Sequence, residues 1–198
     1  MRASGIQVGK GSSVIDGWTI RIATGDDAGA VADIYGEYVR TSTATFEEDA
    51  PSVDECRLRI ENTLAQYPFL VVCDQFLAVV GFCYAHALRE RSAYLHSAET
   101  TIYLSSRAQH TGVAAALYTE LERILARQGV TNLYACITGE NEASLRFHST
   151  CGYARCAQFN SCGYKFNRWL DIIWMEKLIA DHGAPAPFIP FSQLSHAQ

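Results

Sequence analysis

Residues 109–115 have the composition of a loop that binds a phosphate group. They follow an alternating run of β-branched and aromatic residues, Thr100–Leu104, and they lead into a stretch of small residues. The first N–H groups of a helix have no intrahelical partners and carry partial positive charge, and small side chains let an anion approach them closely. We therefore predict a phosphate cradle formed by Gln109, His110, Thr111, Gly112, Val113, Ala114 and Ala115. An ordinary turn before an alanine-rich helix would have the same composition, so this segment alone leaves both interpretations open.

A second set of polar residues, Asn141, Ser144 and His148, is spaced three and four positions apart. Side chains at this spacing share one face of a helix, whereas Leu145 and Phe147 point elsewhere. An imidazole can take up a proton near neutral pH, so His148 is a candidate for acid–base chemistry. Simple exposure of a polar stripe to solvent would give the same spacing.

Hydrophobic periodicity predicts the elements that position both sets of residues. We expect strands at Thr19–Ala23, Phe69–Cys73, Phe76–Ala87, Thr100–Leu104, Thr131–Ile137, Tyr153–Phe159 and Leu170–Leu178. Helices are expected to begin at Thr24, Ser52, Gly112 and Asn141, and a loop at Thr43–Phe46 follows the first of them. The order β-α-α-β-β-β-α-β-α-β-β mixes hairpins with crossovers. The predicted fold class is therefore α/β (α+β), with a mixed, mostly antiparallel central sheet flanked by helices.

The first two predicted helices have recognisable starts and apolar faces. Thr24 with Asp27, and Ser52 with Glu55, have the spacing of a capping box. The apolar positions recur at helical spacing, so we expect buried faces made of Val31, Ile34, Tyr35 and Tyr38 in the first helix, and of Val53, Cys56, Ile60 and Leu64 in the second. A hairpin turn is expected at Asp74-Gln75, and Gly129 is expected to end the central helix.

The composition favours one domain and excludes several classes of function. The chain has 198 residues, 48% of them hydrophobic, and a formal net charge of −5. This charge argues against a broad surface for nucleic acid or anionic membrane, and no apolar run approaches the roughly 18 residues of a membrane span. We expect a flexible lead-in at residues 1–18, a domain at 19–178 and a tail at 179–198, with Phe188, Ile189 and Phe191 packing back onto the domain.

The seven cysteines are an odd number and include no Cys-x-x-Cys pair. Most lie in apolar runs, such as Cys73, Cys83 and Cys136, which favours reduced core thiols in a cytoplasmic protein. The remaining cluster, Cys151, Cys156 and Cys162, is too widely spaced for a zinc site and lacks paired histidines. We therefore expect no metal.

Two motifs together resemble the GNAT N-acetyltransferases. Gln109-x-x-Gly112-x-Ala114 after a strand is similar to the loop that binds the pyrophosphate of acetyl-CoA in that family. The second signature of the family is similar to Asn141-x-Ala143-Ser144…His148-x-x-x-Gly152-Tyr153. A histidine at the place of His148 is a feature of the branch that resembles phosphinothricin acetyltransferase.

Further segments resemble the same branch and extend the likeness over residues 19–178. They are Thr45-Phe46, Tyr67-Pro68-x-Leu70-Val71, Glu99-x-x-Ile102-Tyr103 and Gly163-Tyr164-Lys165-Phe166-x-Arg168-Trp169-x-Asp171. Asn167 and Ser106 depart from the glycine and proline that are usual at these places in the branch, which changes only the local stiffness of the backbone.

The resemblance implies transfer of an acetyl group from acetyl-CoA to a primary amine. A protonated amine must lose a proton before it attacks a thioester, and a carboxylate or imidazole can take that proton. Glu99 is the expected base, through water or directly, with His148 as its partner or as the base itself. The pantetheine amides would pair with Ile102 and Leu104, and a backbone N–H near Tyr103–Leu104 would stabilise the oxyanion. Asn141 and Ser144 would hold the other side of acetyl-CoA.

The acceptor pocket of the branch corresponds to the loop before the central strand and to the Phe46 segment. Arg89 and Arg91 suit a bidentate grip on a carboxylate or phosphinate, beside Tyr94 and Phe46. The resemblance implies an acceptor such as phosphinothricin or methionine sulfoximine, and a homodimer. Two alternatives stay open. One is a GNAT enzyme acting on an antibiotic, a polyamine or a protein N-terminus, and the other is a regulator that binds acyl-CoA without catalysis.

Overall fold

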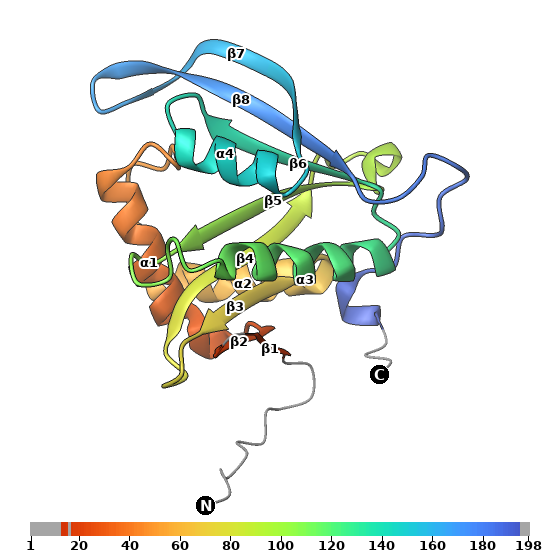
Figure 1. The fold of residues 1–198 in the computed structure, drawn as a ribbon, viewed down its shortest axis with the longest axis horizontal. Coiled ribbons are helices and arrows are strands. Elements are labelled where there is room, and N and C mark those ends of the chain that lie inside the picture. The colour runs from red at the N-terminus through yellow and green to blue at the C-terminus, as the bar shows by residue number, and fades with distance from the viewer. Residues whose placement is uncertain (1–12, 16, 195–198) are drawn as a thin grey trace, which may run out of the picture.

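The described part of the chain contains one sheet of eight strands with helices on both faces (Figure 1). The computed structural model describes residues 13–15 and 17–194. The strands are β1 Ser13–Ile15, β2 Trp18–Ile22, β3 Phe69–Cys73, β4 Val79–Ala87, β5 Ser97–Leu104, β6 Asn132–Thr138, β7 Ala154–Lys165 and β8 Arg168–Leu178. The α-helices are α1 Ala28–Thr41, α2 Val53–Gln66, α3 Val113–Arg127 and α4 Glu142–Thr150, and 3₁₀ turns lie at Gly25–Asp27, Ser92–Tyr94 and Phe191–Gln193.

The strands lie in the order β1-β2-β3-β4-β5-β6-β8-β7. Every neighbouring pair is antiparallel except β5 and β6, which are parallel because α3 carries the chain back before β6 begins. The mixed, mostly antiparallel sheet is the predicted one.

The two faces of the sheet are covered by different helices, so neighbouring residues on a central strand face different surroundings. In Figure 1, α3 and α4 lie on the near face of the sheet, and α1 and α2 lie on the far face. On β3, Leu70 and Val72 join the core cluster that includes α3, whereas Phe69, Val71 and Cys73 join the cluster that includes α1 and α2. Side chains alternate along a strand, and this alternation also decides where the residues of β5 point.

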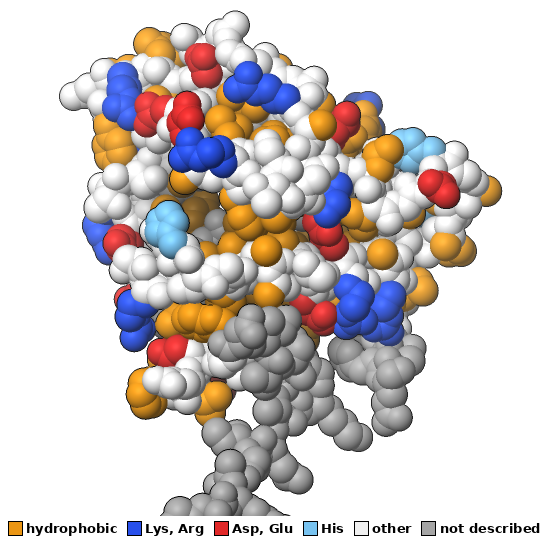
Figure 2. Space-filling model, viewed as in Figure 1, with side chains coloured by type: hydrophobic (Ala, Val, Ile, Leu, Met, Phe, Trp, Pro, Cys, Tyr) orange, Lys and Arg blue, Asp and Glu red, His pale blue; other side chains and the backbone are white. Residues whose placement is uncertain are grey.

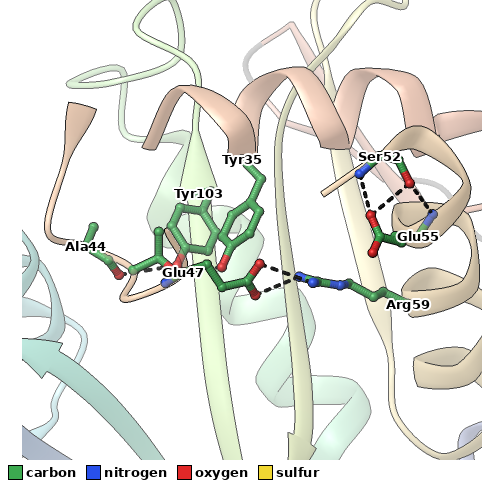
Figure 3. Close-up of polar contacts among 8 residues, drawn as sticks. Tyr35, Ala44, Glu47, Ser52, Glu55, Arg59 and Tyr103 are labelled. Atoms are coloured by element: carbon green, nitrogen blue, oxygen red, sulfur yellow. Dashed lines mark hydrogen bonds and ion pairs between the residues drawn. The ribbon is translucent and has the colours of Figure 1, made fainter. Parts of the chain in front are cut away.

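Both predicted capping boxes are present, one at the 3₁₀ turn that leads into α1 and the other at the start of α2. The carboxylate of Asp27 accepts from the Thr24 N–H at 2.8 Å and is gripped by both terminal nitrogens of Arg21 at 2.7 Å. Ser52 and Glu55 bond to each other's backbone N–H, at 2.7 and 3.2 Å (Figure 3). Gly129, with a φ of 85°, lies just past the end of α3, as predicted.

Several predicted boundaries and buried positions are wrong, among them Cys136, which is exposed. Val53 is 46% exposed because it is the first residue of α2 and lies outside the buried face that Cys56 and Ile60 form. Phe76 does not belong to β4: it is 80% exposed in the turn, where the Asp74 carboxylate accepts from its N–H and from that of Ala78. This side-chain bonding keeps the turn longer than the predicted Asp74-Gln75.

The last two strands extend further than predicted, to Lys165 in β7 and from Arg168 in β8. The expected lead-in at 1–18 lies mostly outside the described residues, but its described part includes β1, which pairs with β2. In the tail, Phe188 and Phe191 pack onto the core as predicted, whereas Ile189 is 39% exposed. Among the described residues, no helix has the length and apolar character needed to cross a membrane.

Candidate active site

A large cavity opens where β5 and β6 separate. The two strands pair only between Ser97–Glu99 and Asn132–Tyr134. Beyond this point Thr100–Leu104 and Ala135–Thr138 line opposite sides of a cavity of about 710 Å³. Figure 2 shows hydrophobic side chains on the floor of a hollow between α4 and the N-terminal end of α3.

The predicted cradle lies at one end of this cavity. Gln109, His110, Gly112, Ala114 and Ala115 line the cavity, whereas Val113 turns into the core. Gly112 precedes the first residue of α3 with a φ of 85°, a left-handed conformation that favours glycine, and a Cβ built on it would meet no atom within 4 Å. The helix start is therefore open toward the cavity, which is the geometry that an anion needs.

Thr111 does not line the cavity but closes the turn before it. Its hydroxyl donates to the Ala108 carbonyl at 2.8 Å. Gln109 ties the same loop to the central strand, because its side-chain amide donates to the Tyr38 hydroxyl at 3.1 Å and to the Leu104 carbonyl at 3.4 Å.

Glu99 lies on β5 with its side chain toward the face of α1 and α2. It has the same parity as Tyr103, which joins the core cluster on that face. The carboxylate is 19% exposed, and its Oε1 lies 3.9 Å from the Nε2 of His86 on β4. Burial raises the pKa of Glu99, although the charges of His86 and Arg89 oppose the rise. A carboxyl group with a raised pKa is a better proton acceptor than an exposed one.

His148 lies on α4 and is almost completely buried, at 3% exposure. Its Nδ1 lies 2.8 Å from the Ser144 carbonyl oxygen, which can only accept, so Nδ1 carries the proton. The Nε2 forms a hydrogen bond with the Tyr118 hydroxyl, 2.9 Å away. Burial lowers the pKa of His148, partly offset by the bond to Ser144. Both ring nitrogens of His148 are therefore already engaged in hydrogen bonds.

Glu99 and His148 line the same cavity but approach it from opposite faces of β5. The next residue, Thr100, faces α3, and its hydroxyl lies 3.3 Å from the hydroxyl of Tyr118, the partner of His148. Tyr153 completes this buried network at 3.2 Å from the Thr100 hydroxyl. Sequence reasoning placed both residues over the thioester and missed Tyr118, because nothing local marks which tyrosine of a helix will meet a histidine of another.

The central strand and α4 supply the other predicted cavity residues. Ile102, Tyr103 and Leu104 line it, and the Leu104 carbonyl accepts from the Tyr38 hydroxyl at 2.7 Å. Asn141 and Ser144 line it from α4, and the Asn141 side chain also caps that helix by accepting from the Ser144 N–H at 3.1 Å.

Only one of the four residues predicted to bind the acceptor lines the cavity. Phe46 lines the cavity. Arg89, Arg91 and Tyr94 are exposed and do not line it, and the Arg89 guanidinium donates to the neighbouring Leu88 carbonyl at 2.8 Å. His86 was not predicted, although its position opposite Glu99 follows from the β4–β5 register.

Comparisons with known proteins show the family of this chain. Residues 20–174 match the family model of the acetyltransferase (GNAT) domain. The chain is 33% identical to the phosphinothricin N-acetyltransferase of Streptomyces viridochromogenes, over 88% of this chain and 95% of that protein. It is 29% identical to the L-methionine sulfoximine/L-methionine sulfone acetyltransferase of Salmonella typhimurium, over 84% and 98%.

A solved structure shares the fold over nearly the whole domain. It is the crystal structure of a GNAT superfamily phosphinothricin acetyltransferase from Sinorhizobium meliloti in complex with AcCoA. The likeness has a TM-score of 0.83 at 32% identity and covers 90% of this chain and 98% of that one. The chain belongs to the GNAT acetyltransferase family.

Proposed function

We propose that the protein transfers the acetyl group of acetyl-CoA to the primary amine of a small amino acid-like acceptor, of the phosphinothricin or methionine sulfoximine type. The observation that carries this proposal is one cavity that joins the open start of α3 to the carboxylate of Glu99. The phosphinothricin and methionine sulfoximine acetyltransferases similar to this chain support the choice of acceptor.

Acetyl-CoA fits the cavity as a co-substrate. The pyrophosphate would lie against the start of α3, where the space beside Gly112 is open. The pantetheine arm would follow Ile102–Leu104 in the gap between β5 and β6, with Asn141 and Ser144 on its other side. Residues 109–115 would thus supply backbone N–H groups and partial positive charge to the phosphates.

Glu99 would be the general base of a direct transfer. It accepts the ammonium proton, the amine nitrogen bonds to the thioester carbonyl carbon, and the carbon–sulfur bond breaks to release the thiolate. The carbonyl oxygen, on which negative charge develops, would accept a hydrogen bond from a backbone N–H near Tyr103–Leu104. The contacts of His148 support a positioning role for it, because its Nε2 is already hydrogen-bonded to the Tyr118 hydroxyl.

The acceptor would bind on the Glu99 side of the sheet, against Phe46. Arg89 and Arg91 would grip its anionic group from the loop before β5, and Tyr94 would add a wall beside them. An effect of Arg89 on the pKa of Glu99 supports the placement of this loop near the base.

We further propose a homodimer in the cytoplasm. The β7–β8 hairpin projects beyond the helices (Figure 1). It exposes four large aromatic side chains, which a second copy would cover: Phe159, Tyr164, Phe166 and Trp169. All seven cysteines are free thiols, which supports a reducing compartment.

Thiol release from acetyl-CoA with a panel of amines tests the function. We expect release to depend on phosphinothricin or methionine sulfoximine and to be slow with polyamines. Release that requires a polyamine, an antibiotic or a peptide N-terminus would replace the proposed acceptor class. No release with any amine would favour a non-catalytic acyl-CoA-binding protein.

A further inference from the structure

The end of the β7–β8 hairpin makes unusual contacts with the loop that follows α1. Lys165, the last residue of β7, is only 3% exposed. Its Nζ donates to the Ser42 carbonyl at 2.9 Å and to the Thr45 carbonyl at 2.8 Å. A buried ammonium is stable only where such acceptors are present, so these bonds fix both the lysine and the loop.

A second tie runs from the same hairpin through the turn before α4. The Thr43 hydroxyl donates to the Glu140 carboxylate at 2.7 Å, and Arg168, the first residue of β8, pairs with the same carboxylate. The Thr138 hydroxyl donates to the Thr43 carbonyl. Each residue from Ser42 to Thr45 except Ala44 is thus bonded to β6, to the turn after it, or to the hairpin.

Gly163 of β7 leaves room for Phe46, the residue that follows Thr45 in the loop after α1. A Cβ at position 163 would lie 1.9 Å from Cε2 of the Phe46 ring and 2.5 Å from its Cζ. The aromatic ring therefore packs directly on the hairpin backbone, and any side chain at position 163 would displace it. Phe46 lines the cavity together with Ser42, Ala44 and Thr45.

The opposite side of the loop is held by the helices and the central strand. The Tyr103 hydroxyl donates to the Ala44 carbonyl at 3.3 Å, and both terminal nitrogens of Arg59 on α2 donate to the Glu47 carboxylate at 2.8 and 3.1 Å (Figure 3). Tyr35 of α1 bonds to the Thr45 hydroxyl at 2.6 Å. The contacts from the hairpin complete a clamp on segment 42–46.

We propose that Lys165 is a positioning residue that holds segment 42–46 as the wall of the acceptor site, and that Gly163 sets the reach of that wall through Phe46. The motif Gly163–Asp171, which contains both residues, then contributes to acceptor recognition. This inference rests on the proposed function, because it assigns the wall to the acceptor and not to acetyl-CoA, whose cradle lies on a separate loop.

Lys165→Met tests the proposal, with Lys177→Met as its matched control. Lys177 is a half-buried lysine on β8 that pairs with Glu122 at 2.7 Å, away from segment 42–46. We expect Lys165→Met to raise the KM for phosphinothricin or methionine sulfoximine about tenfold or more, as for a lost charged hydrogen bond. The turnover number at saturation and the acetyl-CoA Kd should change less than about threefold, and the control should keep the wild-type KM. An unchanged acceptor KM, or an equal loss with the control, overturns the proposal.

Gly163→Ala gives an independent test that does not alter any hydrogen bond. The glycine has an ordinary backbone conformation, so the added methyl acts through the displaced Phe46 ring. We expect the ratio of kcat/KM between phosphinothricin and methionine sulfoximine to change by about threefold or more. An unchanged ratio shows that Phe46 does not set selectivity. If Lys165→Met does not fold, this variant decides the proposal.

Hydrogen exchange separates failure of the clamp from failure of the proposed function. Amides of segment 42–47 should exchange faster in Lys165→Met than in wild type and in Lys177→Met, whether or not an acceptor is known. Unchanged exchange refutes the clamp. Faster exchange in a protein that acetylates no amino acid-like amine keeps the clamp but refutes the acceptor assignment.

Discussion

Replacement of Glu99 by glutamine removes the proposed base and keeps its size and hydrogen-bonding shape. The loss of a positioned general base lowers turnover by about 10²-fold or more. The acetyl-CoA Kd should change little, because Glu99 faces α1 and α2 whereas the cradle is the start of α3. The measurement is thiol release at saturating acetyl-CoA, followed between about pH 6 and 9.

The sign of the pH effect follows from the surroundings of Glu99. Burial raises its pKa, and only the deprotonated carboxylate accepts a proton, so kcat/KM should fall as the pH drops through that pKa. His86 lowers the pKa of Glu99, so His86→Asn should move the acidic limb of the plot of kcat/KM against pH to higher pH. In Glu99→Gln the limb should vanish along with most of the activity. If Glu99→Gln retains near-normal turnover over the whole range, solvent takes the proton and the reasoning is wrong.

Three further predictions test separate parts of the molecule. Gly112→Asp should weaken acetyl-CoA binding about tenfold or more, because a negative side chain would occupy the space for the phosphates, and calorimetry measures this. Arg89→Ala and Arg91→Ala should each raise the acceptor KM about tenfold in steady-state kinetics. Only Arg89→Ala should also shift the acidic limb of the pH–rate profile to higher pH, because Arg89 lowers the pKa of Glu99. An unchanged acceptor KM in both variants would exclude an anionic group on the acceptor. Asp27→Asn should lower the free energy of unfolding by about 1–2 kcal/mol at neutral pH. Burial alone would raise the pKa of Asp27, but the hydrogen bonds from Arg21 and the Thr24 N–H lower it. The stabilisation by Asp27 is therefore present above the pKa of the unfolded chain and is lost as the pH falls through the pKa of the folded protein. Denaturant titrations at several pH values measure this loss.

Local signals in the sequence were sufficient for most of the fold. The start of α3 is marked by Gly112 and the small residues after it, and the start of α2 by Ser52 and Glu55, because a helix cap is a contact over three residues. The turn at Asp74 is longer than predicted, because the Asp74 carboxylate accepts from two backbone N–H groups. Composition does not reveal such bonds.

The candidate site was predictable in its residues and less so in its geometry. Glu99 and His148 both reach the cavity, but the sequence did not show that they enter from opposite faces of β5. That difference depends on how β5 and β6 diverge and on which tyrosine of α3 meets His148. The role of Lys165 was likewise invisible, because its partners lie more than a hundred positions away in the chain.

The most direct test of the central claim is to identify the product by mass spectrometry. The wild-type protein, acetyl-CoA and phosphinothricin or methionine sulfoximine are incubated together, and thiol release is measured in parallel. We expect one acetyl group on the acceptor nitrogen for each thiol released, at a rate reduced about 10²-fold in Glu99→Gln. Thiol release without N-acetylated product, or equal product formation by the variant, would contradict it.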